Sequence, residues 1–340
     1  MKKILTAMSG GVDSSVAAAL LLERGFDVCG VTMNLFGEGA GTAVRDAKLV
    51  ADALSIQHYV VDAVDIFEKT VINYFVNEYK SGRTPNPCVV CNRHLKFGML
   101  MDKAAELGCD YLATGHYAIM DDGRLRRGVD TRKDQSYFLY PILAASTDKI
   151  MFPLGDLVKD EVRSLAQKFN LPTAEKGDSQ DICFIPSGNY LDFLTSRGIG
   201  IDDGSTAGKI IDTTGKIIGK HTGIHNFTVG QRKGLGALGK KMYVKSISVD
   251  DNTVTAAEEH ELGSDEVVIR DVITGKGGID TGKKFLVQIR YRSQPVNATI
   301  TDVGNSTLRL KFDEPVRAAS PGQSAVIYDG DIVVSGGIII

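Results

Sequence analysis

The first 34 residues constrain the fold more than any other part of the chain. Residues 3–8 form a short apolar run that predicts a β-strand, and residues 15–24 (SVAAALLLER) predict a helix that ends at Gly25. Residues 28–34 (VCGVTMN) predict a second strand. A strand, a helix and a strand within about thirty residues form a βαβ unit, whose two strands lie parallel in one sheet.

The same alternation continues to about residue 200. Helices are predicted over residues 45–54, 66–80, 95–107 and 159–169, and strands over residues 58–62 and 111–115. Strands that alternate with helices form a parallel sheet that the helices cover. The sequence therefore predicts an α/β domain with a doubly wound parallel sheet over residues 1–200.

After residue 200 the pattern changes to β structure. In FLVQIRYR, Phe285, Val287, Ile289 and Tyr291 alternate with polar residues, which predicts a strand with one buried and one polar face. TLRLKF repeats the alternation, and AVIYDGDIVV predicts a hairpin around an Asp-Gly turn. We expect a small β-rich central domain over residues 201–262 and a C-terminal β-barrel over residues 263–340.

The composition is that of a globular protein, with 340 residues, 43% of them hydrophobic, and a net charge of −3. No apolar run reaches the roughly 18 residues that span a bilayer, and the apolar start is too short for a signal peptide. We therefore expect a cytoplasmic monomer without membrane contact. Its five cysteines are then reduced, and paired cysteines indicate metal binding or catalysis.

Two basic segments are the candidates for contact with nucleic acid. They are residues 124–133 (RLRRGVDTRK) and residues 230–245 (GQRKGLGALGKKMYVK). The acidic net charge does not indicate a nucleic-acid binder, so binding would depend on local positive charge. On charge alone, a solvated loop is the favoured interpretation of each segment.

The loop AMSGGVDSS joins the first predicted strand to the first helix, where backbone N–H groups and a helix N-terminus can bind an anion. It is neither a Walker A loop nor the dinucleotide-binding fingerprint. An ordinary tight turn is the alternative. The pattern S-G-G-x-D-S resembles the pyrophosphate loop of ATP pyrophosphatases, which cleave ATP between the α and β phosphates and adenylate a substrate. The resemblance implies that Ser9, Gly10, Gly11, Asp13 and Ser14 hold pyrophosphate, with Asp13 acting through Mg²⁺. It leaves the acceptor open, because amidation, argininosuccinate synthesis, lysidine formation and thiolation all use this loop.

Three cysteines stand in predicted loops. Cys88 and Cys91 lie in TPNPCVVCN, and Cys183 lies in DSQDICFIP. The first pair could be half of a zinc site that needs further ligands such as His94, a redox disulfide, or nucleophiles. The two other cysteines of the chain, Cys29 and Cys109, are interpreted as small packed side chains without chemistry.

The chain resembles the tRNA-specific 2-thiouridylase family over nearly its whole length. The matching stretches are AMSGGVDSS, GRTPNPCVVCNRHLKFG, YLATGHYA, KDQSYFLY, PLGDLVKDEVR, PTAEKGDSQDICFI, TVGQRKGLG, IRYR and SPGQSAV. The resemblance implies a fold like that of ATP pyrophosphatases and adenine nucleotide alpha hydrolases. It also implies ATP- and sulfur-dependent conversion of the wobble uridine of tRNA to 2-thiouridine. The implied sulfur donor is a cysteine desulfurase, a persulfide carrier or free sulfide.

The resemblance assigns roles by position. Cys91 corresponds to the family's nucleophile and Cys183 to its persulfide-carrying cysteine. The implied ATP site is Ala7, Met8, Ser9, Gly10, Gly11, Val12, Asp13, Ser14, Met33 and Gly115. The implied tRNA contacts are Asn86, Pro87 and Cys88 at the target base, and His116, Lys133, Asp134, Gln135, Arg290, Tyr291 and Gln323.

Cys88 departs from the family pattern, which most often has Asp at this position. Cys88, Cys91 and Cys183 together could hold a 4Fe–4S cluster with one open iron, or could form a persulfide relay. The absence of an obvious fourth ligand favours the cluster hypothesis. Two other function classes are an amide-forming synthetase that uses the same loop, and a non-catalytic RNA-binding protein whose β-barrel is the working part.

Overall fold

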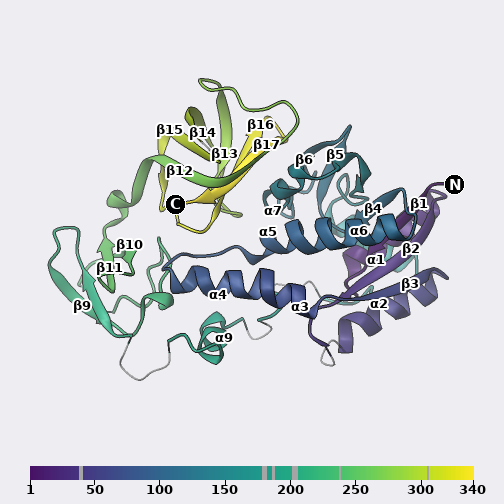
Figure 1. Ribbon diagram of the computed structural model, residues 1–340, viewed down its shortest axis with the longest axis horizontal. Coiled ribbons are helices and arrows are strands. Elements are labelled where there is room, and N and C mark those ends of the chain that lie inside the picture. The colour runs from purple at the N-terminus through teal and green to yellow at the C-terminus, as the bar shows by residue number, and fades with distance from the viewer. Residues whose placement is uncertain (38–40, 178–181, 186–187, 201–205, 237–238, 305) are drawn as a thin grey trace.

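A parallel sheet forms the N-terminal half of the molecule, as predicted (Figure 1). The structure is a computed structural model that describes residues 1–340 except 38–40, 178–181, 186–187, 201–205, 237–238 and 305. Every pair of neighbouring strands in this sheet is parallel. The strand order is β3 (Gln57–Asp62), β2 (Asp27–Asn34), β1 (Lys3–Ala7), β4 (Tyr111–Thr114) and β7 (Ile150–Met151).

Helices cover both faces of this sheet, so the doubly wound prediction is confirmed. On one face, Ile4 and Val28 pack with Leu21 of α1 (Val12–Glu23), and α2 (Gly41–Ala53) and α8 (Lys159–Lys168) pack beside α1. On the other face, Leu5 and Leu112 pack against the helical segment that ends in α6 (Leu100–Glu106). Alternate residues of the strands therefore face opposite helical layers, as a sheet buried on both sides requires.

The predicted loop around Cys88 and Cys91 is wrong, because both cysteines lie in a helix. This helix, α5 (Pro87–Cys91), continues through the π-helical segment η3 (Asn92–Met99) into α6. Pro87 occupies the first helical turn, where its fixed φ and missing N–H favour a helix start. Pro87 therefore begins a helix, whereas Pro85 lies in the irregular segment before it.

The long helix predicted over residues 66–80 is confirmed with an earlier start. It consists of α3 (Val64–Phe67), η2 (Glu68–Ile72) and α4 (Asn73–Lys80), and η2 is again π-helical. The shorter helical elements are α7 (Ser136–Leu139), η4 (Tyr140–Ala144), η5 (Thr147–Lys149), α9 (Tyr190–Ser196), η6 (Ile224–Asn226) and η7 (Glu259–Leu262). No helix in the described part of the chain is long and apolar enough to cross a membrane.

The C-terminal β-barrel is confirmed. Six strands close into a ring because the first, β12, pairs with both β15 and β17. In ring order they are β12 (Gly263–Thr274), β15 (Thr307–Arg317), β14 (Val296–Gly304), β13 (Lys284–Gln288), β16 (Ser324–Asp329) and β17 (Ile332–Ile339). A separate four-stranded sheet precedes the ring and contains β10 (Tyr243–Ser248), β11 (Thr253–Ala257), β8 (Gly208–Ile211) and β9 (Ile217–His221).

The strand predicted from FLVQIRYR is only partly correct. Phe285 and Val287 are buried as expected, but β13 ends at Gln288, whose side chain is also buried. Arg290 folds inward and donates hydrogen bonds of 2.7 Å to the carbonyl oxygens of Val229 and Ala318. Two of the residues expected on the polar face of this strand, Gln288 and Arg290, therefore form hydrogen bonds inside the protein.

A hairpin that the sequence did not reveal joins the two halves of the molecule. β5 (Ala118–Asp121) and β6 (Arg124–Arg127) follow β4, and β6 pairs with β17 of the barrel (Figure 1). The interpretation of residues 124–133 as a solvated basic loop is therefore wrong for its first residues. Arg126 pairs with Asp121 and Asp331, and Arg127 pairs with Asp134.

Arg127 anchors this junction through three contacts. Its guanidinium lies 3.1 Å from Asp134 Oδ2, donates to Gln288 Oε1 at 3.1 Å, and stacks 3.6 Å from the ring centroid of Tyr328. Asp134 is buried and also accepts hydrogen bonds from the Gly128 N–H and the Ser136 hydroxyl. The buried carboxylate therefore depends on Arg127 for its counter-charge.

We expect Arg127→Ala to lower the free energy of unfolding by about 3–5 kcal/mol, because it leaves the Asp134 carboxylate buried without a cation. Urea denaturation measures the loss. The matched control is Arg124→Ala on the same hairpin, whose exposed side chain should change stability by less than about 0.5 kcal/mol. Equal effects of the two variants would contradict the role of Arg127.

Candidate active site

The loop between β1 and α1 is shaped for close approach of an anion. Gly10 has a φ of +70°, and a Cβ there would lie 2.6 Å from the Ala43 carbonyl oxygen, so only glycine fits. The Ser9 N–H donates to Ser14 Oγ at 3.1 Å, which tightens the turn. Gly11 precedes α1 without a side-chain cap, so the first N–H groups and the positive end of the helix dipole face the loop.

Two lysines that the sequence did not single out flank this loop. Lys159 Nζ lies 2.7 Å from Asp13 Oδ1, which also accepts a hydrogen bond of 2.8 Å from the Tyr117 hydroxyl. Lys176 Nζ donates to the Gly10 carbonyl oxygen at 2.8 Å. A lysine at the first position of a helix opposes the helix dipole. That unfavourable placement of Lys159 at the start of α8 was the signal available in the sequence.

The residues expected at an ATP site meet at the carboxyl edge of the parallel sheet. Ala7 ends β1, Met33 lies one residue before the end of β2, and Gly115 directly follows β4. A Cβ on Gly115 would lie 2.8 Å from the backbone carbon of Asp13. Ligands of open α/β sheets bind at this edge. The remaining expected residues belong to the loop itself or, like Met8 and Val12, are buried beneath it.

The three candidate thiols lie within electrostatic range of one another. Cys88 and Cys91 occupy successive turns of α5, and Cys183 lies in an irregular segment. Burial raises the pKa of Cys88 and of Cys91. The pKa of Cys183 rises to about 12, through burial first and then through the charges of Cys91 and Cys88. The raised pKa values keep all three thiols protonated at neutral pH. Cys88 and Cys183 are exposed and Cys91 is half-buried, so a reactant can reach the site.

His116 and Lys96 lie between the loop and the thiols. His116 follows Gly115 and is 7% exposed, with Nδ1 2.6 Å from Thr114 Oγ1 and Nε2 3.2 Å from Lys96 Nζ. Burial and the Lys96 charge hold the pKa of His116 well below its ordinary value, so the imidazole is neutral. His116 is therefore mostly enclosed by protein, and its contact with tRNA stays a prediction.

The other residues expected at tRNA gather around the junction with the barrel. Gln135 accepts a hydrogen bond from the Tyr117 N–H, Tyr291 packs on Phe138, and Lys133 is half-buried. Gln323 donates to the Thr84 carbonyl oxygen at 2.9 Å, just before Asn86 and Pro87 open α5. With Asp134 and Arg290, most of these side chains are therefore engaged within the protein.

Across the residues that the structure describes, no group of three or more His, Cys, Asp or Glu side chains is arranged to hold a metal ion. His94, the ligand considered for zinc, is exposed. Outside the site, Cys29 and Cys109 lie with their sulfur atoms 3.7 Å apart. Burial and then Cys109 raise the pKa of Cys29 to about 12, so its thiol is unreactive at neutral pH.

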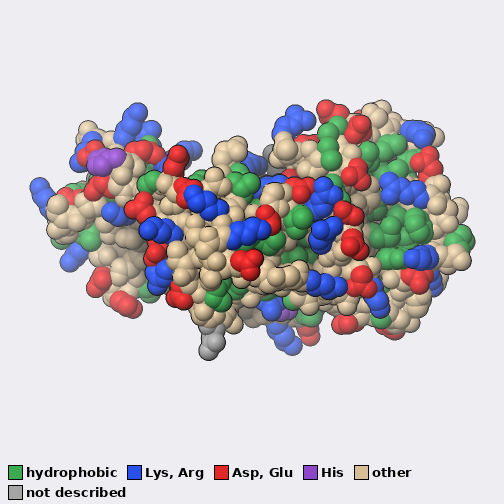
Figure 2. Space-filling view, turned by 90° about the horizontal axis from the view of Figure 1, so that it is seen from above, with side chains coloured by type: hydrophobic (Ala, Val, Ile, Leu, Met, Phe, Trp, Pro, Cys, Tyr) green, Lys and Arg blue, Asp and Glu red, His purple; other side chains and the backbone are tan. Residues whose placement is uncertain are grey.

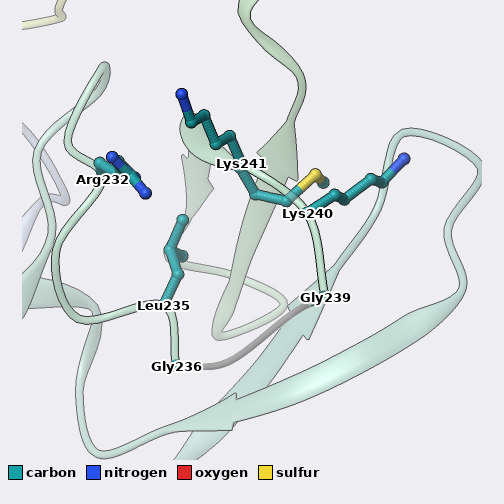
Figure 3. Close-up of a pocket in the computed structure, with 7 residues that line it drawn as sticks. Arg232, Leu235, Gly236, Gly239, Lys240 and Lys241 are labelled. Carbon is teal, nitrogen blue, oxygen red and sulfur yellow. The ribbon is translucent and has the colours of Figure 1, made fainter.

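A basic pocket of about 350 Å³ lies in the loop before β10 (Figure 3). Arg232, Lys240 and Lys241 line it, and Lys240 pairs with Glu258. Lys241 extends toward the side where Arg232 lies, whereas Lys240 points away. Arg232 and Lys241 form no ion pair with any described residue. Elsewhere, on the face in Figure 2, basic and acidic side chains are interspersed.

Comparisons with known proteins cover the whole chain. The family model described as tRNA methyl transferase HUP domain matches residues 2–187. The models described as tRNA methyl transferase PRC-barrel domain and aminomethyltransferase beta-barrel domain match residues 201–258 and 276–339. A protein of Acetivibrio thermocellus named tRNA-specific 2-thiouridylase MnmA is 45% identical, over 99% of this chain and 99% of its own. A protein of the same name from Clostridioides difficile is 42% identical, over 99% of this chain and 98% of its own.

We expect Gly10→Ala to weaken ATP binding at least tenfold, or about 1.4 kcal/mol, because the new Cβ would displace the loop from Ala43. Isothermal titration calorimetry measures the affinity. Gly25→Ala is the matched control, since Gly25 also has a positive φ but no atom within 4 Å of the added Cβ. Unchanged ATP affinity in Gly10→Ala would mean that the loop does not hold the nucleotide.

Proposed function

Because the chain belongs to the tRNA-specific 2-thiouridylase family, we propose that it carries out ATP-dependent 2-thiolation of the wobble uridine of tRNA. The protein is a tRNA sulfurtransferase. One observation supports the proposal: Gly115 lies against the glycine-rich loop, and the next residue, His116, contacts Lys96, which follows Cys91 by five residues. This arrangement provides for activation of an oxygen by adenylation and for sulfur attack at the same carbon. The protein works in the cytoplasm as a monomer.

Adenylation is the task of the loop and its lysines. The loop N–H groups bind the pyrophosphate that leaves when the uridine O2 attacks the α-phosphate, and Lys159 and Lys176 contribute positive charge. Both hydrogen bonds to Asp13 reach Oδ1, so Oδ2 can bind Mg²⁺. That ion would neutralise phosphate charge. The wobble base must leave the anticodon stack to reach the site.

The sulfur step uses two thiols. A donor first places sulfur on Cys183 as a persulfide, whose terminal sulfur attacks C2 of the adenylated uridine, and AMP leaves with the electron pair of the C2–O bond. The Cys91 thiolate then attacks Cys183 Sγ, which breaks the sulfur–sulfur bond and releases 2-thiouridine once N3 takes a proton. A Cys91–Cys183 disulfide remains, and a thiol reductant returns it to two thiols with two electrons and two protons.

A 4Fe–4S cluster on Cys88, Cys91 and Cys183 is the second candidate for the sulfur carrier. The observation in its favour is that Cys88 lies within electrostatic range of the other two thiols. The three thiols are not arranged to bind one metal centre in the described structure, however, so no step is assigned to a cluster. Iron and acid-labile sulfide in protein purified without oxygen distinguish the two mechanisms. About four irons per chain, lost in Cys88→Ala, indicate a cluster, and no iron in either protein indicates the persulfide pair.

We expect Cys91→Ser and Cys183→Ser each to lower 2-thiouridine formation by a factor on the order of 1000, because a hydroxyl cannot carry or resolve sulfur. Mass spectrometry of nucleosides from digested tRNA measures the product. Cys109→Ser, which changes a thiol outside the site, is the control and should retain full activity.

Measurement of AMP formation with and without tRNA distinguishes the function classes. AMP formation that depends on tRNA excludes a non-catalytic RNA-binding protein and an amide synthetase. Either cysteine variant with the wild-type rate of 2-thiouridine formation would refute its assigned role.

The basic pocket before β10 is proposed to contact the tRNA backbone. We expect Arg232→Ala with Lys241→Ala to weaken tRNA binding and to reduce the slope of log K against log salt by about 1.5, since two phosphate contacts are lost. Fluorescence anisotropy over a salt series measures both quantities. The control pair, Arg24→Ala with Lys168→Ala at the ends of α1 and α8, removes the same charges far from the loop. An equal slope for both pairs would exclude the pocket from the tRNA contact.

A further inference from the structure

Lys96 is placed beside the thiols by an unusual helical segment. η3 is π-helical, and in a π-helix residues five positions apart lie on the same side. Lys96 follows Cys91 by five residues. In a regular α-helix the two side chains would point in different directions. Single π-helical turns occur often at functional sites, and here the π-helical geometry places Lys96 on the side of the segment that carries Cys91.

His116 fixes the position of the Lys96 ammonium. An ammonium has donors only, so the ring nitrogen 3.2 Å away, Nε2, must accept the hydrogen bond. Nδ1 therefore carries the ring proton and donates to Thr114 Oγ1 at 2.6 Å. Phe97 and Phe152 enclose the ring, with centroids 5.9 Å from it. The imidazole is a rigid acceptor whose orientation is set from both sides.

Lys96 has no carboxylate partner in the described part of the chain. Its side chain is half-buried, and the ion pairs of the described residues do not include it. Its charge lowers the pKa of Cys88, Cys91 and Cys183, in each case against a larger effect of burial. Among the described residues, the half-buried Lys96 ammonium contacts a neutral imidazole and has no anionic partner, which suits it to an anion that exists only during the reaction.

We propose that Lys96 is the cation that balances the negative charge of the attacking sulfur, and that His116 is a positioning residue that acts through Lys96. This inference rests on the proposed function. It gives His116 a role in addition to the tRNA contact that the family resemblance implies. The role is electrostatic, so it belongs to the sulfur step and not to adenylation at the loop.

The test uses the full-length protein, ATP, a cysteine desulfurase with cysteine as the persulfide donor, a thiol reductant, and a tRNA transcript with a wobble uridine. Lys96→Met keeps the length and packing of the side chain and removes its charge. We expect it to lower 2-thiouridine formation on the order of 100-fold. Pyrophosphate–ATP exchange that depends on tRNA, which reports adenylation alone, should stay within about threefold of wild type. Lys96→Arg restores the charge and should recover most of the thiolation.

His116→Phe keeps a ring between Phe97 and Phe152 but removes the acceptor for Lys96. We expect it to lower 2-thiouridine formation roughly tenfold and to leave pyrophosphate–ATP exchange nearly unchanged. The loss is smaller than in Lys96→Met because the ammonium remains but no longer has its hydrogen-bond acceptor. Unaltered thiolation in Lys96→Met would overturn the inference. So would equal losses of exchange and thiolation together with no rescue by arginine, which indicates a structural role. A wild-type protein that thiolates no tRNA would instead refute the proposed function itself.

Discussion

The contact between Gly115 and the backbone of Asp13 and Ser14 is the constraint on which the site depends. The end of β4 lies so close to the start of α1 that no Cβ fits between them. This contact fixes the height of the loop above the sheet. It also fixes His116, the next residue, and through His116 the Lys96 ammonium. The carboxyl ends of β1 and β4 therefore position both the loop and the helical segment that carries Lys96.

The barrel stabilises the other side of the same site. The Gln323 side chain and the Pro321 carbonyl oxygen bind the backbone of Thr84, directly before α5. The Tyr137 hydroxyl donates to the Ser324 carbonyl oxygen at 2.8 Å, which ties the first turn of α7 to β16. Several residues expected to touch tRNA thus hold the barrel against the catalytic half. The segments proposed to contact tRNA are therefore also the segments that connect the barrel to the parallel-sheet domain.

Much of the fold could be predicted from the sequence, because local signals agree with the tertiary structure. Alternating apolar residues marked β15, and the Asp-Gly turn marked the β16–β17 hairpin. The glycine-rich loop could be predicted as a turn between β1 and α1 because the positive φ of Gly10 is a local property, whereas the contact of Gly10 with Ala43 could not. The β5–β6 hairpin was missed, since its stability comes from pairing with β17, more than 200 residues later. Lys96, Lys159 and Lys176 were missed for a related reason: a single lysine has no periodicity, and its role depends on the partner that the fold brings to it.

The raised pKa values of the thiols have a consequence for the resting protein. Peroxides and alkylating electrophiles react with thiolates and only slowly with thiols. Cys88, Cys91 and Cys183 are all protonated at neutral pH, so in the free protein they react slowly with such compounds. In the proposed reaction, the sulfur atom that attacks the base is the outer sulfur of a persulfide, which is present only after a donor has delivered it. The raised pKa values of these cysteines thus protect them from oxidation at rest, although Cys88 and Cys183 are exposed.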